Sequence, residues 1–79
     1  MTRIKKRTFA NILKTYPDAM TRVARLEHRG GCNVCYYSVE VGDRHKDVAA
    51  IELHDEVPED DDRPMVRYFA PKYVLNQIP

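Results

Sequence analysis

The sequence predicts an α+β fold in which one short N-terminal helix packs on a small antiparallel sheet of about four strands, arranged as a meander. Three patterns carry this prediction: an apolar stripe at helical spacing, a Gly-Gly pair between two alternating runs, and two later runs that alternate. The 79 residues are the length of one domain. We expect residues 8–79 to form that single domain and residues 1–7 to be a mobile basic arm.

The helix is predicted between Thr8 and Tyr16. Its apolar residues recur at the spacing of one helical face and are Phe9, Ile12, Leu13 and Tyr16. The Thr8 hydroxyl can accept a hydrogen bond from an early backbone N–H, and Pro17 disfavours helical geometry at the residue before it. We therefore expect Thr8 to cap a helix that packs its stripe against the sheet.

Gly30-Gly31 predicts a two-residue hairpin turn. With these two residues as the loop, Leu26 faces Cys35 and Ala24 faces Tyr37, and one face of the hairpin is nearly all apolar. A helix over Tyr16–Arg29 is the competing interpretation. It rests on a capping-box pattern in residues 15–18 and a helix-end pattern in residues 28–30.

Residues 42–47 are expected to form a polar turn, after which Val48–Val57 alternates as a half-buried strand antiparallel to Cys35–Val41. An acidic loop bracketed by prolines follows at residues 58–64. Met65–Ala70 is predicted as the last strand, with Arg67 and Phe69 on one face and Tyr68 on the other.

The C-terminal segment, residues 71–79, is too apolar to be a free tail. Small domains need all of their apolar surface, so we expect the segment to dock on this domain rather than on another chain. Its docking residues would be Tyr73, Val74, Leu75 and Ile78.

Charge is distributed unevenly along the chain. Residues 1–31 carry eight Lys or Arg and two Asp or Glu, whereas residues 32–63 carry three and ten. Such polarity can steer partners of opposite charge, although the two halves can also neutralise each other within the fold. Two cysteines do not make a disulfide framework, and no apolar run is long enough to span a membrane, so we expect an intracellular, cytoplasmic protein.

Cys32 and Cys35 form a single C-x-x-C pattern, which with His28, His45 or His54 could complete a zinc site. A second paired knuckle is missing, and a strand would place the two thiols on opposite faces. We therefore expect no cofactor, and a buried apolar role for Cys35. The sequence has no phosphate-binding glycine loop or nucleophile elbow, and we expect no enzymatic activity.

The function expected from these observations is that of a small non-catalytic protein-binding regulator. In its length, charge polarity and apolar C-terminal segment, the chain resembles small phage-encoded regulators that inhibit or modulate a host enzyme such as RNA polymerase, and the resemblance rests on no single motif. It implies a protein partner, a role in transcription regulation and a location in the host cytoplasm. The expected partner-binding residues are cationic or aromatic: Arg3, Lys5, Lys6, Arg7, Arg22, Arg25, Arg29, Tyr36 and Tyr68.

The alternative is a nucleic-acid-binding domain that uses the basic N-terminal half, with or without zinc. Basic and aromatic side chains on a sheet can contact phosphates and stack bases. Tyr36 would lie beside Arg25 on the mixed face of the hairpin, while nearby carboxylates such as Glu40 and Glu52 would repel a polyanion.

Overall fold

The computed structural model describes residues 1–26, 32–54 and 66–78, and within these ranges the side chains of residues 25, 26 and 32 lie outside the description. The described residues form five strands and two short helices, with four of the strands between the helices in the chain. In order they are β1 Thr2–Ile4, α1 Lys6–Thr15, β2 Met20–Leu26, β3 Cys32–Val41, β4 Arg44–His54, β5 Val66–Ala70 and α2 Lys72–Leu75.

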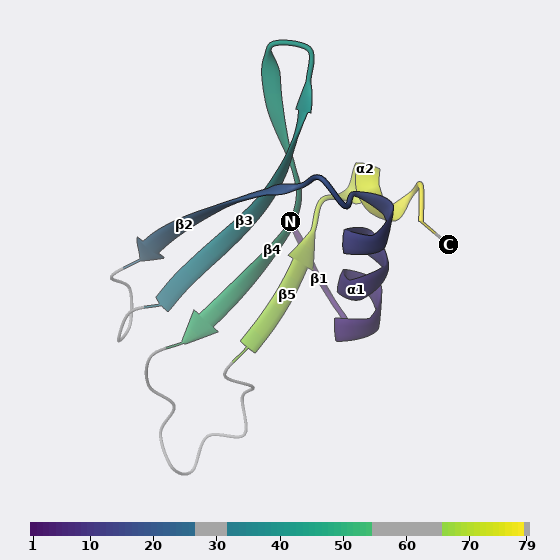
Figure 1. Cartoon of the computed structure of the whole chain (residues 1–79). Helices are drawn as coiled ribbons and strands as arrows, with labels where there is room; N and C mark the ends of the chain where they lie inside the picture. The colour runs from purple at the N-terminus through teal and green to yellow at the C-terminus, as the bar shows by residue number, and fades with distance from the viewer. Residues whose placement is uncertain (27–31, 55–65, 79) are drawn as a thin grey trace.

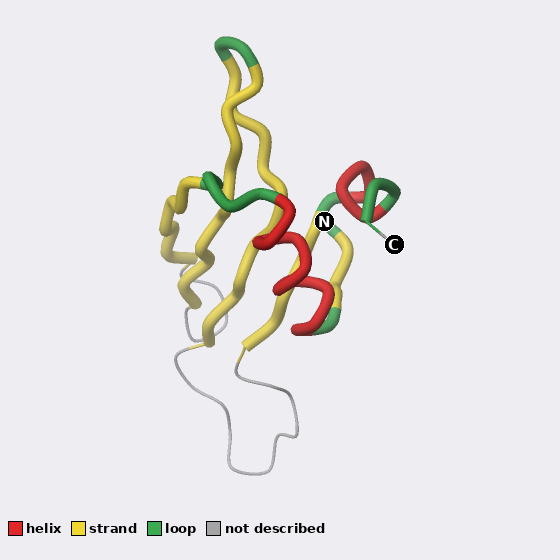
Figure 2. The backbone as a smooth tube through the Cα atoms, turned by 45° about the vertical axis from the view of Figure 1, so that its right-hand side comes forward, coloured by secondary structure: helices red, strands yellow, loops and turns green. Residues whose placement is uncertain are grey.

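The five strands form one antiparallel sheet in the order β1-β5-β4-β3-β2 (Figure 1). The α1 helix lies across one face of this sheet, in front of the strands in Figure 2. The α+β class and the meander from β2 to β5 are therefore confirmed. The sheet has five strands rather than four, and the first helix is preceded by a strand. Neither described helix has the length and apolar character needed to cross a membrane.

The core lies between the two helices and the sheet. Its fully buried apolar residues come from both helices and from two adjacent strands: Phe9, Ile12, Val48, Ala49, Ala70 and Val74. The Phe9 ring packs on Tyr37 at a centroid distance of 5.4 Å and on Tyr68 at 5.0 Å. The helical stripe predicted from the sequence is thus confirmed as the face that packs on the sheet.

The start of α1 differs from the prediction. The helix begins at Lys6, and its N-cap residue Lys5 makes no side-chain capping hydrogen bond. Thr8 therefore lies within the first turn and cannot be the cap. Since Lys5 and the next two residues are all cationic, the helix starts without the side chains that usually stabilise this end.

The basic N-terminal segment belongs to the sheet instead of forming a separate arm. Thr2–Ile4 pairs with β5, and Ile4 packs against the core. Lys6 and Arg7 belong to α1. A three-residue strand with a single apolar side chain gives almost no periodic signal, which is why the sequence did not reveal it.

The strand interpretation of residues 20–26 is confirmed, and the competing helix is wrong for these residues. The hairpin register differs from the prediction, because Leu26 pairs with Cys32 and Ala24 with Val34 instead of with Cys35 and Tyr37. The predicted Gly30-Gly31 turn lies outside the described residues. The register moved by an odd number of positions, so the residues of β2 face the opposite side from the one expected. Val23 of this edge strand is 67% exposed. Because burial of apolar side chains is what fixes a register, the apolar residues of β2 constrain its pairing only weakly.

The β3–β4 hairpin extends beyond the other strands as a two-stranded ribbon (Figure 1). Its turn is only Gly42-Asp43, since Val41 already pairs with Arg44, and Gly42 has a φ of 63°. The predicted polar turn was therefore too long. A bulge follows where Tyr37 pairs with Ala49 and Ser38 with Asp47, which leaves Val48 as the extra residue. This bulge explains why consecutive residues of β4 are buried.

The C-terminal segment docks on its own domain, as predicted. Val74 of α2 is fully buried, and Tyr73, Leu75 and Ile78 pack against the same core. The Tyr73 hydroxyl donates a hydrogen bond to the backbone carbonyl of Asp47 at 2.5 Å. The segment therefore covers the helix side of the sheet, while the other side receives no described helix.

Candidate nucleic-acid interface

One row of side chains crosses all five strands on the face of the sheet opposite α1. The pairing registers place its members directly beside one another in the order Arg3, Phe69, Ala50, Tyr36 and Arg22. Side chains of directly paired residues project to the same face of a sheet. The result is a cross-strand row with an arginine at each edge, two aromatic rings inside it and a small residue at its centre.

This row lies within a second, smaller apolar cluster made only of strand residues. Val34 and Ala50 are buried beneath the partly buried rings of Tyr36 and Phe69. The Arg22 guanidinium carbon lies 4.8 Å from the centroid of the Tyr36 ring, within the range of a cation–π contact. We call this side of the sheet the open face; its described residues include Arg3, Arg22, Ala24, Val34, Tyr36, Ser38, Asp47, Ala50, Glu52, His54, Arg67 and Phe69.

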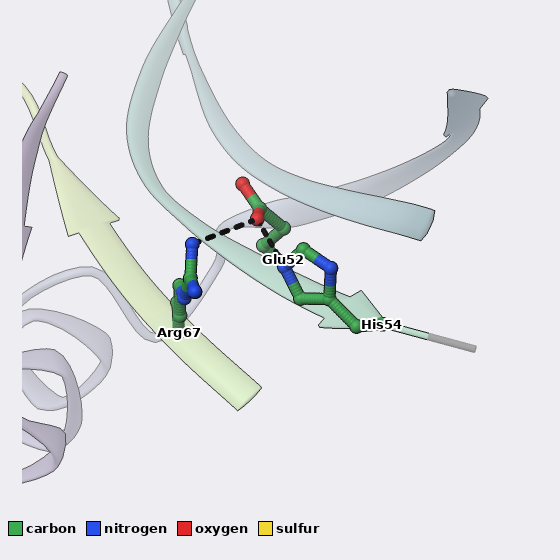
Figure 3. Close-up of polar contacts among 3 residues, drawn as sticks. All are labelled: Glu52, His54 and Arg67. Carbon is green, nitrogen blue, oxygen red and sulfur yellow. Dashed lines mark hydrogen bonds and ion pairs between the residues drawn. The ribbon is translucent and has the colours of Figure 1, made fainter. Parts of the chain in front are cut away.

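A polar cluster on the open face adjoins the cross-strand row (Figure 3). Glu52 pairs across the strands with Arg67 and lies two residues after Ala50. Its Oε1 atom contacts the His54 Nε2 atom and lies 3.9 Å from a terminal nitrogen of Arg67. The three side chains are only 23–27% exposed, and the buried Nε of Arg67 has no hydrogen-bond partner among the described residues. The Arg67 guanidinium thus offsets part of the negative charge of Glu52, and the His54 ring contacts the same carboxylate oxygen.

Further basic side chains lie near β1, on the side of the sheet that α1 covers. Arg3, Lys5 and Lys6 line a shallow hollow together with apolar side chains of β5 and α2. The three cationic side chains are exposed. Ile4, Tyr68 and Leu75 of this hollow pack toward the helix side, so the hollow does not belong to the open face.

The structure brings together part of the predicted partner-binding set. Arg3, Arg22 and Tyr36 share the open face, whereas Lys5 and Lys6 line a hollow on the helix side of the sheet. Arg7 is exposed in the first turn of α1. Tyr68 is wrong as an exposed anchor, because its ring packs against Phe9 beneath α1. Tyr36 pairs with Arg22 rather than lying beside Arg25, whose side chain lies outside the description, as does Arg29.

Sequence reasoning did not identify Phe69, Ala50, Arg67 or Glu52 as site residues. It did place Arg67 and Phe69 on one face of the last strand, and this is confirmed. The missing information was the pairing of that strand with its neighbours. Only the register shows that Phe69 and Tyr36 lie on the same row.

The zinc hypothesis receives no test from the geometry. His28 lies outside the described residues, and so does the side chain of Cys32. Cys35 is a partly buried free cysteine, and the other candidate, His54, contacts Glu52. Within residues 1–26, 32–54 and 66–78, no group of three or more His, Cys, Asp or Glu is arranged to hold a metal ion.

Two tyrosines on the helix side have perturbed acidity. Burial, and to a lesser extent the neighbouring Cys35, raises the pKa of Tyr37. Burial is also the main cause of the raised pKa of Tyr73, followed by the nearby Tyr16 and Asp47. Both phenols are therefore neutral at physiological pH, which suits packing and hydrogen bonding in the core rather than proton transfer.

Comparison of the chain with protein-family models, curated proteins and solved structures finds no match.

Proposed function

We propose that the protein is a non-catalytic binding protein whose open face binds single-stranded nucleic acid. The observation that supports this most directly is the cross-strand row, in which two aromatic rings lie between an arginine at each edge of the sheet. Unpaired bases stack on aromatic side chains of open sheets, and arginines beside them contact phosphates. A duplex does not offer its base faces in this way, so the row favours a single strand.

The charges of the open face support the same proposal. Its described residues include three arginines and the carboxylates of Glu52 and Asp47. Glu52 lies beside Arg67 and His54, and Asp47 accepts a hydrogen bond from the Ser38 hydroxyl. Arg3 and Arg22 lie on the two outermost strands, so a bound strand that runs along the row meets a cation at both ends.

The test is fluorescence anisotropy with labelled single-stranded and duplex oligonucleotides at low and moderate salt. We expect the single strand to bind more tightly, and substitution of both Tyr36 and Phe69 by leucine to weaken binding by about tenfold or more, because base stacking on two rings is lost. Lys14→Gln is the control, since Lys14 is an exposed cation on α1. Equal loss in this control, or no binding by the unaltered protein at low salt, contradicts the proposal.

A protein partner, with host RNA polymerase as one candidate, is the second proposed function. The observation that favours it is the edge strand β2, on which Met20 is 50% and Val23 67% exposed. An edge strand can pair with an extended segment of another protein, and exposed apolar side chains add contact area.

Capture of a protein partner by two variants distinguishes this second function from the first. Val23→Lys should abolish strand addition by placing a charge on the edge, while leaving the cross-strand row intact. We expect a protein partner captured after nuclease treatment to be lost from Val23→Lys and retained by the Tyr36→Leu, Phe69→Leu double variant. The reverse pattern contradicts a partner docked on β2.

A further inference from the structure

Glu52 places a negative charge on the face that is proposed to bind a polyanion. Its carboxylate lies next to the cross-strand row, on the strand that carries Ala50, and is only 24% exposed. A carboxylate at this place repels phosphates, and Arg67, 3.9 Å away, offsets the repulsion only in part. A carboxylate is also a hydrogen-bond acceptor with no donor of its own, which makes it selective among the bases.

Figure 3 shows how the carboxylate is held. Both interactions converge on one oxygen, Oε1, while the second oxygen points away from His54 and Arg67. The Arg67 guanidinium therefore lies beside the carboxylate and presents donors next to its acceptors. Arg67 is two residues before Phe69 on β5, so this acceptor–donor pair adjoins the ring on which a base would stack.

The Watson–Crick edge of guanine matches this acceptor–donor pair. It carries two adjacent donors, the N2 amino group and N1–H, and the O6 acceptor beside N1–H. Adenine and cytosine each place an acceptor beside their amino group, and thymine or uracil has a single N–H between two acceptors. We propose that Glu52 and Arg67 recognise the Watson–Crick edge of a guanine stacked on Phe69, with the carboxylate accepting from N1–H and N2–H and the guanidinium donating to O6. This inference rests on the proposed binding of single strands.

The test uses short labelled oligothymidylates, as DNA and as the corresponding RNA, that carry one central guanine, adenine or hypoxanthine. Hypoxanthine keeps N1–H and O6 but lacks the amino group, so it removes one predicted hydrogen bond without altering the protein. We expect guanine to be preferred over adenine by roughly tenfold, with hypoxanthine between them. Glu52→Gln should remove the preference and raise the affinity for plain oligothymidylate, because the charge that repels phosphates is gone.

Three results separate the possible failures. Equal binding of guanine and adenine strands by the unaltered protein overturns guanine recognition and leaves strand binding intact. A guanine preference that persists in Glu52→Gln, with an unchanged circular dichroism spectrum, overturns the role of the carboxylate. Absence of binding to every strand at low salt overturns the proposed function and this inference together.

Discussion

The Arg22 guanidinium lies 4.8 Å from the centroid of the Tyr36 ring, across the outermost strand pair of the sheet. This contact holds a cation against an aromatic surface at the edge of the open face. Two properties of Arg22 can contribute to binding at this place: its positive charge and its planar guanidinium group.

Replacement of Arg22 by glutamine or lysine should separate these two properties. Arg22→Gln removes a phosphate contact, so the slope of log affinity against log salt for a single strand should fall in magnitude by about 0.7. Arg22→Lys keeps the charge and loses the planar group, so it should weaken binding with little change in slope. Anisotropy titrations over a range of salt concentrations measure both quantities. Identical behaviour of the two variants would show that the charge and the planar group do not act separately.

Phe9 of α1 and Phe69 of β5 lie on opposite sides of the sheet, so their substitutions can separate effects on stability from effects on binding. Phe9 is 7% exposed and packs on Tyr37 and Tyr68, so Phe9→Ala should lower the free energy of unfolding by about 3–4 kcal/mol. Phe69 is only partly buried, and Phe69→Leu should cost about 1 kcal/mol while weakening single-strand binding. Urea denaturation and anisotropy measure the two effects. A Phe69→Leu protein that binds as tightly as the unaltered one contradicts stacking at this ring.

The uncapped start of α1 can be stabilised by one substitution. Lys5→Asp supplies an acceptor for the free backbone N–H groups and replaces a positive charge near the helix N-terminus by a negative one, so stability should rise by about 1 kcal/mol. Lys5→Ala is the control and should change stability little. A urea midpoint for Lys5→Asp no higher than that of Lys5→Ala would disprove the capping argument.

Tyr73 should make stability depend on pH in the alkaline range. Burial, with smaller effects of Tyr16 and Asp47, raises its pKa above the ordinary value of 10.0. The folded state then keeps its proton to higher pH than the unfolded state, so this stabilisation is complete below pH 10 and is lost as pH rises through the raised pKa.

Tyr73→Phe should therefore flatten the alkaline fall in stability. It should also cost about 1 kcal/mol near neutral pH, because the hydrogen bond to the Asp47 carbonyl is lost. Some alkaline slope should remain, since the pKa of Tyr37 is raised in the same direction. Thermal unfolding followed between neutral pH and about pH 11 provides the comparison. An alkaline slope identical to that of the unaltered protein would show that Tyr73 does not contribute.

Strong local periodicity predicted the elements around the core. The stripe from Phe9 to Tyr16 gave α1 and its buried face, and the alternation of residues 65–70 gave β5 with Tyr68 and Phe69 on opposite sides. The apolar C-terminal segment was correctly expected to dock on its own domain. In each case neighbouring apolar side chains pack against the same core, so their spacing in the sequence predicts the element and its buried face.

The open face was predicted poorly because it depends on registers between distant strands. Exposure of Val23 weakens the apolar pattern that would have fixed the pairing of β2, and the bulge at Val48 shifts the pairing of β4 within the β3–β4 ribbon. The strand that carries Arg3 contains too few apolar residues to be recognised. Arg3, Phe69, Tyr36 and Arg22 therefore looked unrelated along the chain and became one row only in the folded sheet.

The central claim is that single strands bind the open face and leave the helix side free. NMR titration of the isotopically labelled protein with a short single-stranded oligonucleotide tests it most directly, through the side-chain signals of Phe69, Tyr36 and Phe9. We predict saturable shifts of the Phe69 and Tyr36 ring signals and of the Arg22 guanidinium, with the Phe9 ring signals unmoved. Shifts centred on α1 and α2, or no saturable shift at low salt, would contradict the claim.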